Sequence, residues 1–190
     1  MTPDDVSGWF SRDEGRWYAA QAARLRPGAV LVEVGSWKGR STAFVGPTCR
    51  ERGVRLVCVD AWAGSKDEHA AAYLEGLARE DVRAVFDETL RRFDLDVEVL
   101  HMTSLAAAAH VGPGRADLVF LDASHDEASV AADLAAWSIV LRAGGTLAGH
   151  DWHEPGVTSA VHAFAMARGL RVERGAGSTW RLPRSGASAV

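Results

Sequence analysis

The stretch VLVEVGSWKGRST, residues 30–42, decides how the rest of the chain is interpreted. It joins an almost wholly apolar run with β-branched residues to a turn that has glycines at Gly35 and Gly39. Such a run is typical of a strand that is buried on both faces of a parallel sheet. Because a glycine-rich turn lets backbone N–H groups approach an anionic group closely, the stretch predicts a nucleotide-like ligand at the end of this strand.

The same alternation of helix and strand continues on both sides of this stretch. Ser11 and Glu14 have capping-box spacing, which predicts a helix over residues 11–25. Further helices are expected over residues 40–52 and 126–142, and further strands at VRLVCVD, VEVL, ADLVFLD and GGTLAGHD. The later helix has one apolar stripe, made of Val130, Leu134, Trp137 and Leu141. It is expected to end at Gly144-Gly145.

Five strands separated by helices imply right-handed βαβ crossovers and a parallel sheet that is covered by helices on both faces. The chain is therefore predicted to form one doubly wound α/β domain over residues 1–182, followed by a disordered tail over 183–190. Residues 63–95 form a long connection, which is interpreted either as a lid over the site or as two packed amphipathic helices.

The composition is that of an ordinary globular domain and disfavours several classes of partner. The 190 residues include 21 Lys and Arg against 25 Asp and Glu, with no basic block, so nucleic acid is not an expected partner. No apolar run approaches the roughly 20 residues that a membrane span needs, and the N-terminus lacks the features of a signal peptide. A cytoplasmic protein is expected, with Cys49 and Cys58 in its core. A homo-oligomer with a contact through Trp9 and Phe10 is left open.

Polar side chains follow the predicted strands at the points where the strands end. They are Glu33, Asp60, Asp122 and the pair His150-Asp151. In doubly wound sheets ligands bind outside the carboxyl ends of the strands, so these side chains are expected to meet at one rim of the sheet.

The first turn favours a ligand group smaller than a pyrophosphate. A dinucleotide fingerprint needs a glycine where Trp37 stands, and a tryptophan there would crowd a pyrophosphate. An amino-acid carboxylate could instead bind at Gly35 and Ser36, and Glu33 would suit an ammonium group. Asp60, at the end of the second strand, can accept hydrogen bonds from both hydroxyls of a ribose. An adenosine that carries an amino-acid end satisfies both loops, and that describes S-adenosylmethionine.

Four motifs, VEVGSWKGRST, VDAWAGSKDEH, LDASHDEASVAADLAAW and LRAGGTLAGHDW, together resemble the class I S-adenosylmethionine-dependent methyltransferases. More narrowly, they resemble the small bacterial branch related to macrocin-type sugar O-methyltransferases. The resemblance covers about residues 10–165. It implies a seven-stranded sheet with one antiparallel strand near the edge, in which GLRVERG and STWRLP are the last two strands.

The resemblance also implies roles for individual residues. Glu33, Gly35, Ser36 and Gly39 would line the methionine part of the cofactor, Asp60 would hold the ribose, Trp62 would flank the adenosine, Ser104 would approach the adenine, and Asp122 would lie beside the reacting methyl group. Catechol-type relatives bind a metal ion at places that Asp122 and Asp151 match. His150 stands where these relatives lead one to expect a carboxylate, so Mg²⁺ and a softer divalent ion both stay open.

Transfer of a methyl group to a hydroxyl needs a general base or a cation that lowers the hydroxyl pKa. Imidazole titrates near neutral pH, so His125 and His150 are candidate bases, which Asp151 or Asp126 could orient. The leading prediction is therefore O-methylation of a small molecule, either a sugar or a specialised metabolite. A NAD-type Rossmann oxidoreductase, which Trp37 disfavours, and a non-catalytic module that binds an adenosine cofactor are the alternatives.

Overall fold

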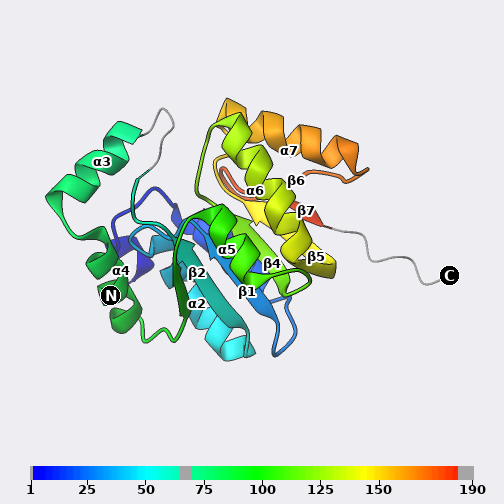
Figure 1. The fold of residues 1–190 in the computed structure, drawn as a ribbon. Coiled ribbons are helices and arrows are strands. Elements are labelled where there is room, and N and C mark those ends of the chain that lie inside the picture. Colours follow the sequence, from blue (N-terminus) through cyan, green and yellow to red (C-terminus); the bar gives the residue numbers. More distant parts are fainter. Residues whose placement is uncertain (1, 65–69, 184–190) are drawn as a thin grey trace.

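The computed structural model of the chain describes residues 2–64 and 70–183, and a seven-stranded sheet lies at its centre (Figure 1). Its strands are β1 (Val30–Val34), β2 (Arg55–Asp60), β3 (Glu98–His101), β4 (Ala116–Leu121), β5 (Leu141–Gly149), β6 (Glu173–Arg174) and β7 (Trp180–Pro183). The spatial order is β3-β2-β1-β4-β5-β7-β6, and β7 runs antiparallel to both of its neighbours. The predicted doubly wound sheet with one antiparallel strand near its edge is therefore confirmed.

Helices cover both faces of the sheet and enclose two apolar cores. They are α1 (Arg12–Ala22), α2 (Arg40–Arg52), α3 (Ala70–Arg79), α4 (Val82–Arg92), α5 (Ser104–Val111), α6 (Glu127–Val140) and α7 (Pro155–Ala167). One core lies between the sheet and α5, α6 and α7, and the other lies between the sheet and α1, α2 and α4. Because side chains alternate along a strand, Val32 and Val34 of β1 enter the first core, whereas Leu31 enters the second.

The N-terminal helix begins as its sequence predicts. Ser11 accepts a hydrogen bond from the backbone N–H of Glu14, and the Glu14 carboxylate accepts one from the backbone N–H of Ser11. This reciprocal capping box starts α1 at Arg12. The helix ends at Ala22, before the predicted limit, because the chain turns there toward Pro27-Gly28.

The prediction that Gly144-Gly145 ends the long helix is wrong. Helix α6 ends at Val140, and β5 begins with the next residue and runs through both glycines. The pairing of β4 with β5 shifts register here, and Gly144 has a φ of 78°, which glycine adopts readily. The glycines therefore allow the shift of register within β5. The apolar stripe of α6 is buried as expected.

The long connection over 63–95 contains α3 and α4, and its residues 65–69 lie outside the described residues. Val82 and Phe86 of α4 are buried in the second core, which agrees with packed amphipathic helices. Motion of this segment as a lid stays a prediction. The predicted tail, apart from Pro183, also lies outside the described residues. In the two ranges that the structure describes, no helix has the length and apolar character to cross a membrane.

Candidate active site

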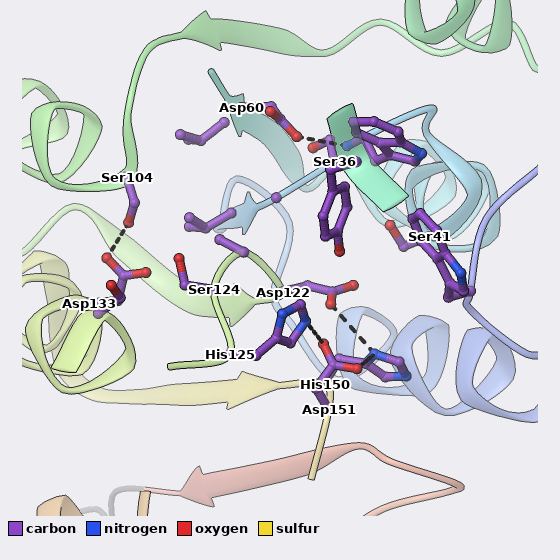
Figure 2. Close-up of a pocket in the computed structure, with 18 of the residues that line it drawn as sticks. Ser36, Ser41, Asp60, Ser104, Asp122, Ser124, His125, Asp133, His150 and Asp151 are labelled. Carbon is purple, nitrogen blue, oxygen red and sulfur yellow. Dashed lines mark hydrogen bonds and ion pairs between the residues drawn. The ribbon is translucent and has the colours of Figure 1, made fainter. Parts of the chain in front are cut away.

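A cavity of about 970 Å³ opens where β1, β2, β4 and β5 end. Strand order reverses between β1 and β4, which is the place where open α/β sheets bind ligands. Asp60, Asp122, His150 and Asp151 all line this cavity, so most of the predicted rim comes together. In Figure 2, Asp60 lies on one side of the cavity and the His150-Asp151 pair lies on another, with Asp122 between them.

The first turn needs Gly35 because two strand ends nearly touch there. Gly35 has a φ of 91°, and a Cβ atom at this position would lie 1.9 Å from the backbone oxygen of Asp122. Gly35 and Ser36 both line the cavity. Gly39 does not, contrary to expectation, because it begins α2 and approaches Phe86 and Thr89 of α4. Its glycine is explained by a φ of 84° and by this close packing.

Asp60 holds two loops together. Its carboxylate accepts hydrogen bonds from the backbone N–H groups of Trp37 and Trp62, with N···O distances of 2.8 and 2.7 Å. Both tryptophans have positive φ values, 46° and 44°, which are unusual for bulky residues. Burial raises the pKa of Asp60, and these N–H groups oppose that rise. The backbone N–H of Ser36 also lowers the pKa of Asp60, so three N–H groups share this carboxylate, and a ligand hydroxyl could use the lone pairs that remain.

Trp62 is not among the residues that line the cavity, and its place beside the adenosine stays a prediction. Its ring packs against Phe86 in the second core, and its indole N–H donates to the backbone oxygen of Trp37 at 2.9 Å. The Arg83 guanidinium lies 4.6 Å from the Trp62 ring centroid. Trp62 therefore supports the first loop from beneath.

Ser104 lines the cavity, and its approach to the adenine stays a prediction. Its hydroxyl is joined to a residue that the sequence analysis did not single out. Its hydroxyl donates to Asp133 at 2.6 Å and accepts from the indole N–H of Trp137 at 2.9 Å. Burial raises the pKa of Asp133 to about 6. The signal for Asp133 was an acid three residues after Val130, within the apolar face of α6. Figure 2 shows Ser104 and Asp133 together, across the cavity from His150 and Asp151.

Glu33 is fully buried and is not among the residues that line the cavity, and its contact with an ammonium group stays a prediction. Along β1 it alternates with Val32 and Val34, so it faces the layer of α1 and α2. The Thr42 hydroxyl donates to its carboxyl group, and the Cys58 sulfur lies 4.0 Å away. Burial raises the pKa of Glu33 to about 7, although hydrogen bonds from Thr42 and Ser36 oppose the rise.

Replacing Glu33 with glutamine is expected to reduce the loss of stability at alkaline pH. The folded-state pKa of about 7 lies above the ordinary value of 4.5, so the stabilising effect is complete below pH 4.5 and is lost as pH rises through 7. That loss amounts to about 3 kcal/mol in the wild type. Urea denaturation at pH 5 and pH 8 measures it, with the exposed Glu51→Gln as control. Equal pH dependence in wild type and Glu33→Gln would contradict this reading.

Two histidines share the carboxylate of Asp151. His125 Nε2 lies 3.0 Å from Asp151 Oδ2, and His150 Nδ1 lies 3.0 Å from Asp151 Oδ1. Asp122 Oδ1 lies 3.5 Å from the same His150 nitrogen. Asp126 caps α6 by accepting from the backbone N–H of Ser129, and Asp151 is an acid that contacts both imidazoles. Asp151 has a φ of 57°, an unusual conformation that turns its side chain toward this cluster.

His150 is surrounded by three carboxylates, which argues against its predicted role as a general base. Besides Asp122 and Asp151, Glu14 lies 3.0 Å from His150 Nε2. Burial lowers the pKa of His150, but the charge and hydrogen bonds of these three acids outweigh burial and raise it to about 12. The metal-free imidazole is therefore protonated at neutral pH, and His125 is the better candidate base. Sequence reasoning assigned Glu14 only to the cap of α1.

Asp122, His150 and Asp151 form a donor set for a divalent cation. Ligand atoms from all three lie within 4.8 Å of one another, and they form the one such group found within residues 2–64 and 70–183. Three carboxylates, those of Glu14, Asp122 and Asp151, lie around His150, and burial raises the pKa of Asp122. Two oxygens and one nitrogen suit a divalent ion that accepts imidazole as well as carboxylate. The residues therefore fit the tentatively predicted metal.

Three aromatic rings stand where the cavity meets solvent. The ring centroids of Trp9, Trp37 and Tyr73 lie 5.1 to 6.1 Å apart, and all three residues line the cavity. Arg40 fixes the segment that carries Trp9, because its guanidinium donates to the backbone oxygens of Val6 and Phe10 at 2.6 and 2.5 Å. The N-terminal segment is thus part of the wall of the site.

This fold and the placement of its loops define a class I S-adenosylmethionine-dependent methyltransferase. A family model described as a methyltransferase domain matches residues 32–152, from β1 to the loop after β5. The chain belongs to this methyltransferase family, which confirms the resemblance seen in the sequence and sets aside the NAD-dependent alternative.

Solved methyltransferase structures share the fold at low sequence identity. An S-adenosylhomocysteine-bound methyltransferase from Podospora anserina is 15% identical, with 96% of this chain and 81% of that chain covered and a TM-score of 0.65. An O-methyltransferase from Bacillus cereus, in complex with S-adenosylhomocysteine, is 15% identical over 92% and 82% of the chains, with a TM-score of 0.60. An S-adenosylmethionine-dependent O-methyltransferase from Thermotoga maritima is 10% identical over 93% and 65%, with a TM-score of 0.65.

Proposed function

We propose that the protein transfers the methyl group of S-adenosylmethionine to a hydroxyl of a small molecule. One observation carries this proposal: a single cavity joins the Gly35-Ser36 turn and Asp60 to the cluster of Asp151 and its two histidines. The described O-methyltransferases of Bacillus cereus and Thermotoga maritima, which share the fold, support the same reaction class.

The cofactor would span the cavity along the strand ends. The Gly35-Ser36 turn offers backbone donors to the carboxylate of the methionine part, since glycine lets the ligand approach closely. Asp60 would accept from the ribose hydroxyls with its remaining lone pairs. Ser104 and Asp133 lie farther along the same wall, where a carboxylate suits the amino group of adenine. The methyl group would then point toward Asp122.

His125 would act as the general base for the acceptor hydroxyl. The sulfonium is already a strong electrophile, so the protein must align the acceptor behind the methyl group and remove its proton. Asp151 would orient His125 through the 3.0 Å contact with Nε2, and Nδ1 would be the nitrogen that takes the proton. When a divalent cation is bound by Asp122, His150 and Asp151, it would lower the pKa of the acceptor hydroxyl.

The acceptor would enter past the aromatic rings of Trp9, Trp37 and Tyr73. Trp9 is 63% exposed, so part of its ring is available for contact with an acceptor. Flat apolar ring faces pack against planar or pyranose-like rings and contribute little to binding phosphate. Lys38 and Arg40 line the same cavity, but each forms an ion pair within the chain, with Glu80 and Asp4. A sugar or specialised metabolite without phosphate fits this wall.

A calorimetric titration with S-adenosylhomocysteine tests the proposal, first after treatment with a chelator and then with Mg²⁺ present. We expect one-to-one micromolar binding, followed by methyl transfer from labelled S-adenosylmethionine to a member of a panel of hydroxylated sugars and phenols. Absence of binding in both conditions would refute the cofactor assignment. Binding without transfer to any hydroxyl acceptor would support the non-catalytic module, and transfer to amines alone would refute O-methylation.

A further inference from the structure

We infer that Glu14 is a positioning residue of the active site, which holds His150 so that its Nδ1 atom faces Asp122 and Asp151. The inference extends the proposed function, because it concerns the side chain that would present a nitrogen ligand to a divalent cation there. Glu14 lies outside residues 32–152, the part of the chain that matches the family model. The N-terminal helix thus supplies a component of the site.

The Glu14 carboxylate is fixed by contacts on both of its oxygens. Oε2 accepts from the backbone N–H of Ser11 at 2.7 Å, which is the capping box of α1. Oε1 accepts from the backbone N–H of Ser178 at 2.8 Å and lies 3.0 Å from His150 Nε2. The side chain is only 8% exposed. Glu14 therefore joins the N-terminal helix, the loop before β7 and His150 in one buried network.

The surroundings of Glu14 and His150 are built for this contact. Gly177 has a φ of 54°, and a Cβ atom there would lie 2.3 Å from Glu14 Oε1, so a larger residue would displace the carboxylate. The Phe10 ring lies 4.9 Å, between centroids, from the His150 ring. The indole N–H of Trp180 donates to the backbone oxygen of His150 at 2.8 Å. The backbone of His150 is thus held by Trp180, and its ring is packed against Phe10.

The identity of the two imidazole nitrogens follows from these partners. Glu14 Oε1 lies at ion-pair distance from His150 Nε2, although the two atoms are not aligned as a hydrogen bond. An ionised carboxylate can only accept, so its charge favours a proton on the nitrogen beside it. In the neutral ring this leaves the lone pair on Nδ1, which faces Asp122 and Asp151. Ligating histidines in proteins commonly donate their other N–H to a carboxylate, which fixes both tautomer and orientation. In this site Glu14 is the carboxylate beside the ring nitrogen that does not face the cation site.

Glu14→Gln tests the inference, because glutamine keeps the size of the side chain but has one oxygen and one amide nitrogen. If the oxygen keeps the cap, the NH₂ group faces His150 and favours the opposite tautomer, with the proton on Nδ1. We expect Mn²⁺ affinity, measured by loss of the free-ion EPR signal, to fall by about 10- to 100-fold. In the metal-free protein both ring nitrogens of His150 carry protons, so long-range ¹H–¹⁵N spectra should show a shifted Nε2–H resonance in Glu14→Gln, where that N–H no longer faces a carboxylate oxygen.

The matched control is Ser11→Ala, which removes a side-chain partner of the same cap but leaves the contact with His150. It should lower stability by about 1 kcal/mol and leave Mn²⁺ affinity and the His150 spectrum unchanged. If Glu14→Gln does not fold, Glu14→Asp, which keeps the charge but cannot reach His150, should give the same losses.

Three results would overturn the inference: unchanged Mn²⁺ affinity in the folded variant, equal loss in Ser11→Ala, or no Mn²⁺ binding by the wild type. Titration of each protein with S-adenosylhomocysteine under metal-free conditions keeps this outcome separate from the proposed function. Glu14→Gln should bind that product as the wild type does. Failure of the wild type to bind S-adenosylhomocysteine would refute the cofactor assignment. The Mn²⁺ affinities and the spectra of the His150 ring would then still decide the role of Glu14.

Discussion

Asp151→Asn is expected to lower kcat by about 10²- to 10⁴-fold while the affinity for S-adenosylhomocysteine stays nearly unchanged. Asp151 contacts both His125 and His150, one through each carboxylate oxygen. Asparagine has only one acceptor oxygen, so one histidine would face an NH₂ group. Where that histidine is His125, its Nε2 would become the acceptor and Nδ1 would carry the proton. The base would then hold a proton at the atom that should receive one.

Single-turnover methyl transfer with a hydroxyl acceptor from the panel measures this effect, and calorimetry measures cofactor affinity in parallel. Asp81→Asn is the matched control, because Asp81 caps α4 and asparagine caps helices equally well. An Asp151→Asn enzyme with a wild-type rate would remove His125 and Asp151 from the mechanism. An equal loss of rate and cofactor binding would indicate that Asp151 maintains the whole loop.

Asp60→Ala is expected to weaken S-adenosylhomocysteine binding by about tenfold or more, since a hydrogen bond to a charged group contributes roughly 1.5 to 3 kcal/mol. The structure adds a second reason, because alanine also frees the backbone N–H groups of Trp37 and Trp62. Both loops would lose the acceptor that holds them in left-handed conformations. Calorimetry gives the affinity, and urea denaturation gives the accompanying loss of stability.

Asp60→Asn separates the two effects. It can still accept from one of the two backbone N–H groups, so it should be more stable than Asp60→Ala while binding the cofactor less tightly than the wild type does. Unchanged affinity in both variants would remove Asp60 from the cofactor site and leave it a purely structural role. Loss of stability with unchanged affinity would lead to the same conclusion.

The sequence predicted the sheet and most of the rim because these features are local and repeated. Alternation of buried strands with amphipathic helices defines the topology, and topology places Asp60, Asp122 and His150 at the carboxyl ends of β2, β4 and β5, on one rim of the sheet. The direction of a side chain was harder to predict. Glu33 belongs to the same motif as Gly35, yet the alternation of side chains along β1 points Glu33 into the layer of α1 and α2. Nothing in the local sequence pattern says which face of the strand is turned toward the ligand.

Glu14 and Asp133 were missed for a different reason. Each already had a sufficient local explanation, Glu14 as a helix cap and Asp133 as a polar position on a helix. Their partners, His150 and Ser104, are distant in sequence and are brought near only by the packing of helices on the sheet. Trp62 shows the converse. Its proximity in sequence to Asp60 suggested a contact with the ligand, but its ring packs against Phe86 in the second core.

Arg40 is the first residue of α2, directly after the turn that would bind the methyl donor, and its guanidinium holds the backbone on both sides of Trp9. In the proposed function, the turn that binds the methyl donor and the wall that contacts the methyl acceptor are therefore both held in place by Arg40. Disorder introduced at the acceptor wall would be transmitted to the start of α2, and a loosened donor turn would in turn release the wall. In the proposed function, the two substrates would thus be linked through Arg40 before either has bound.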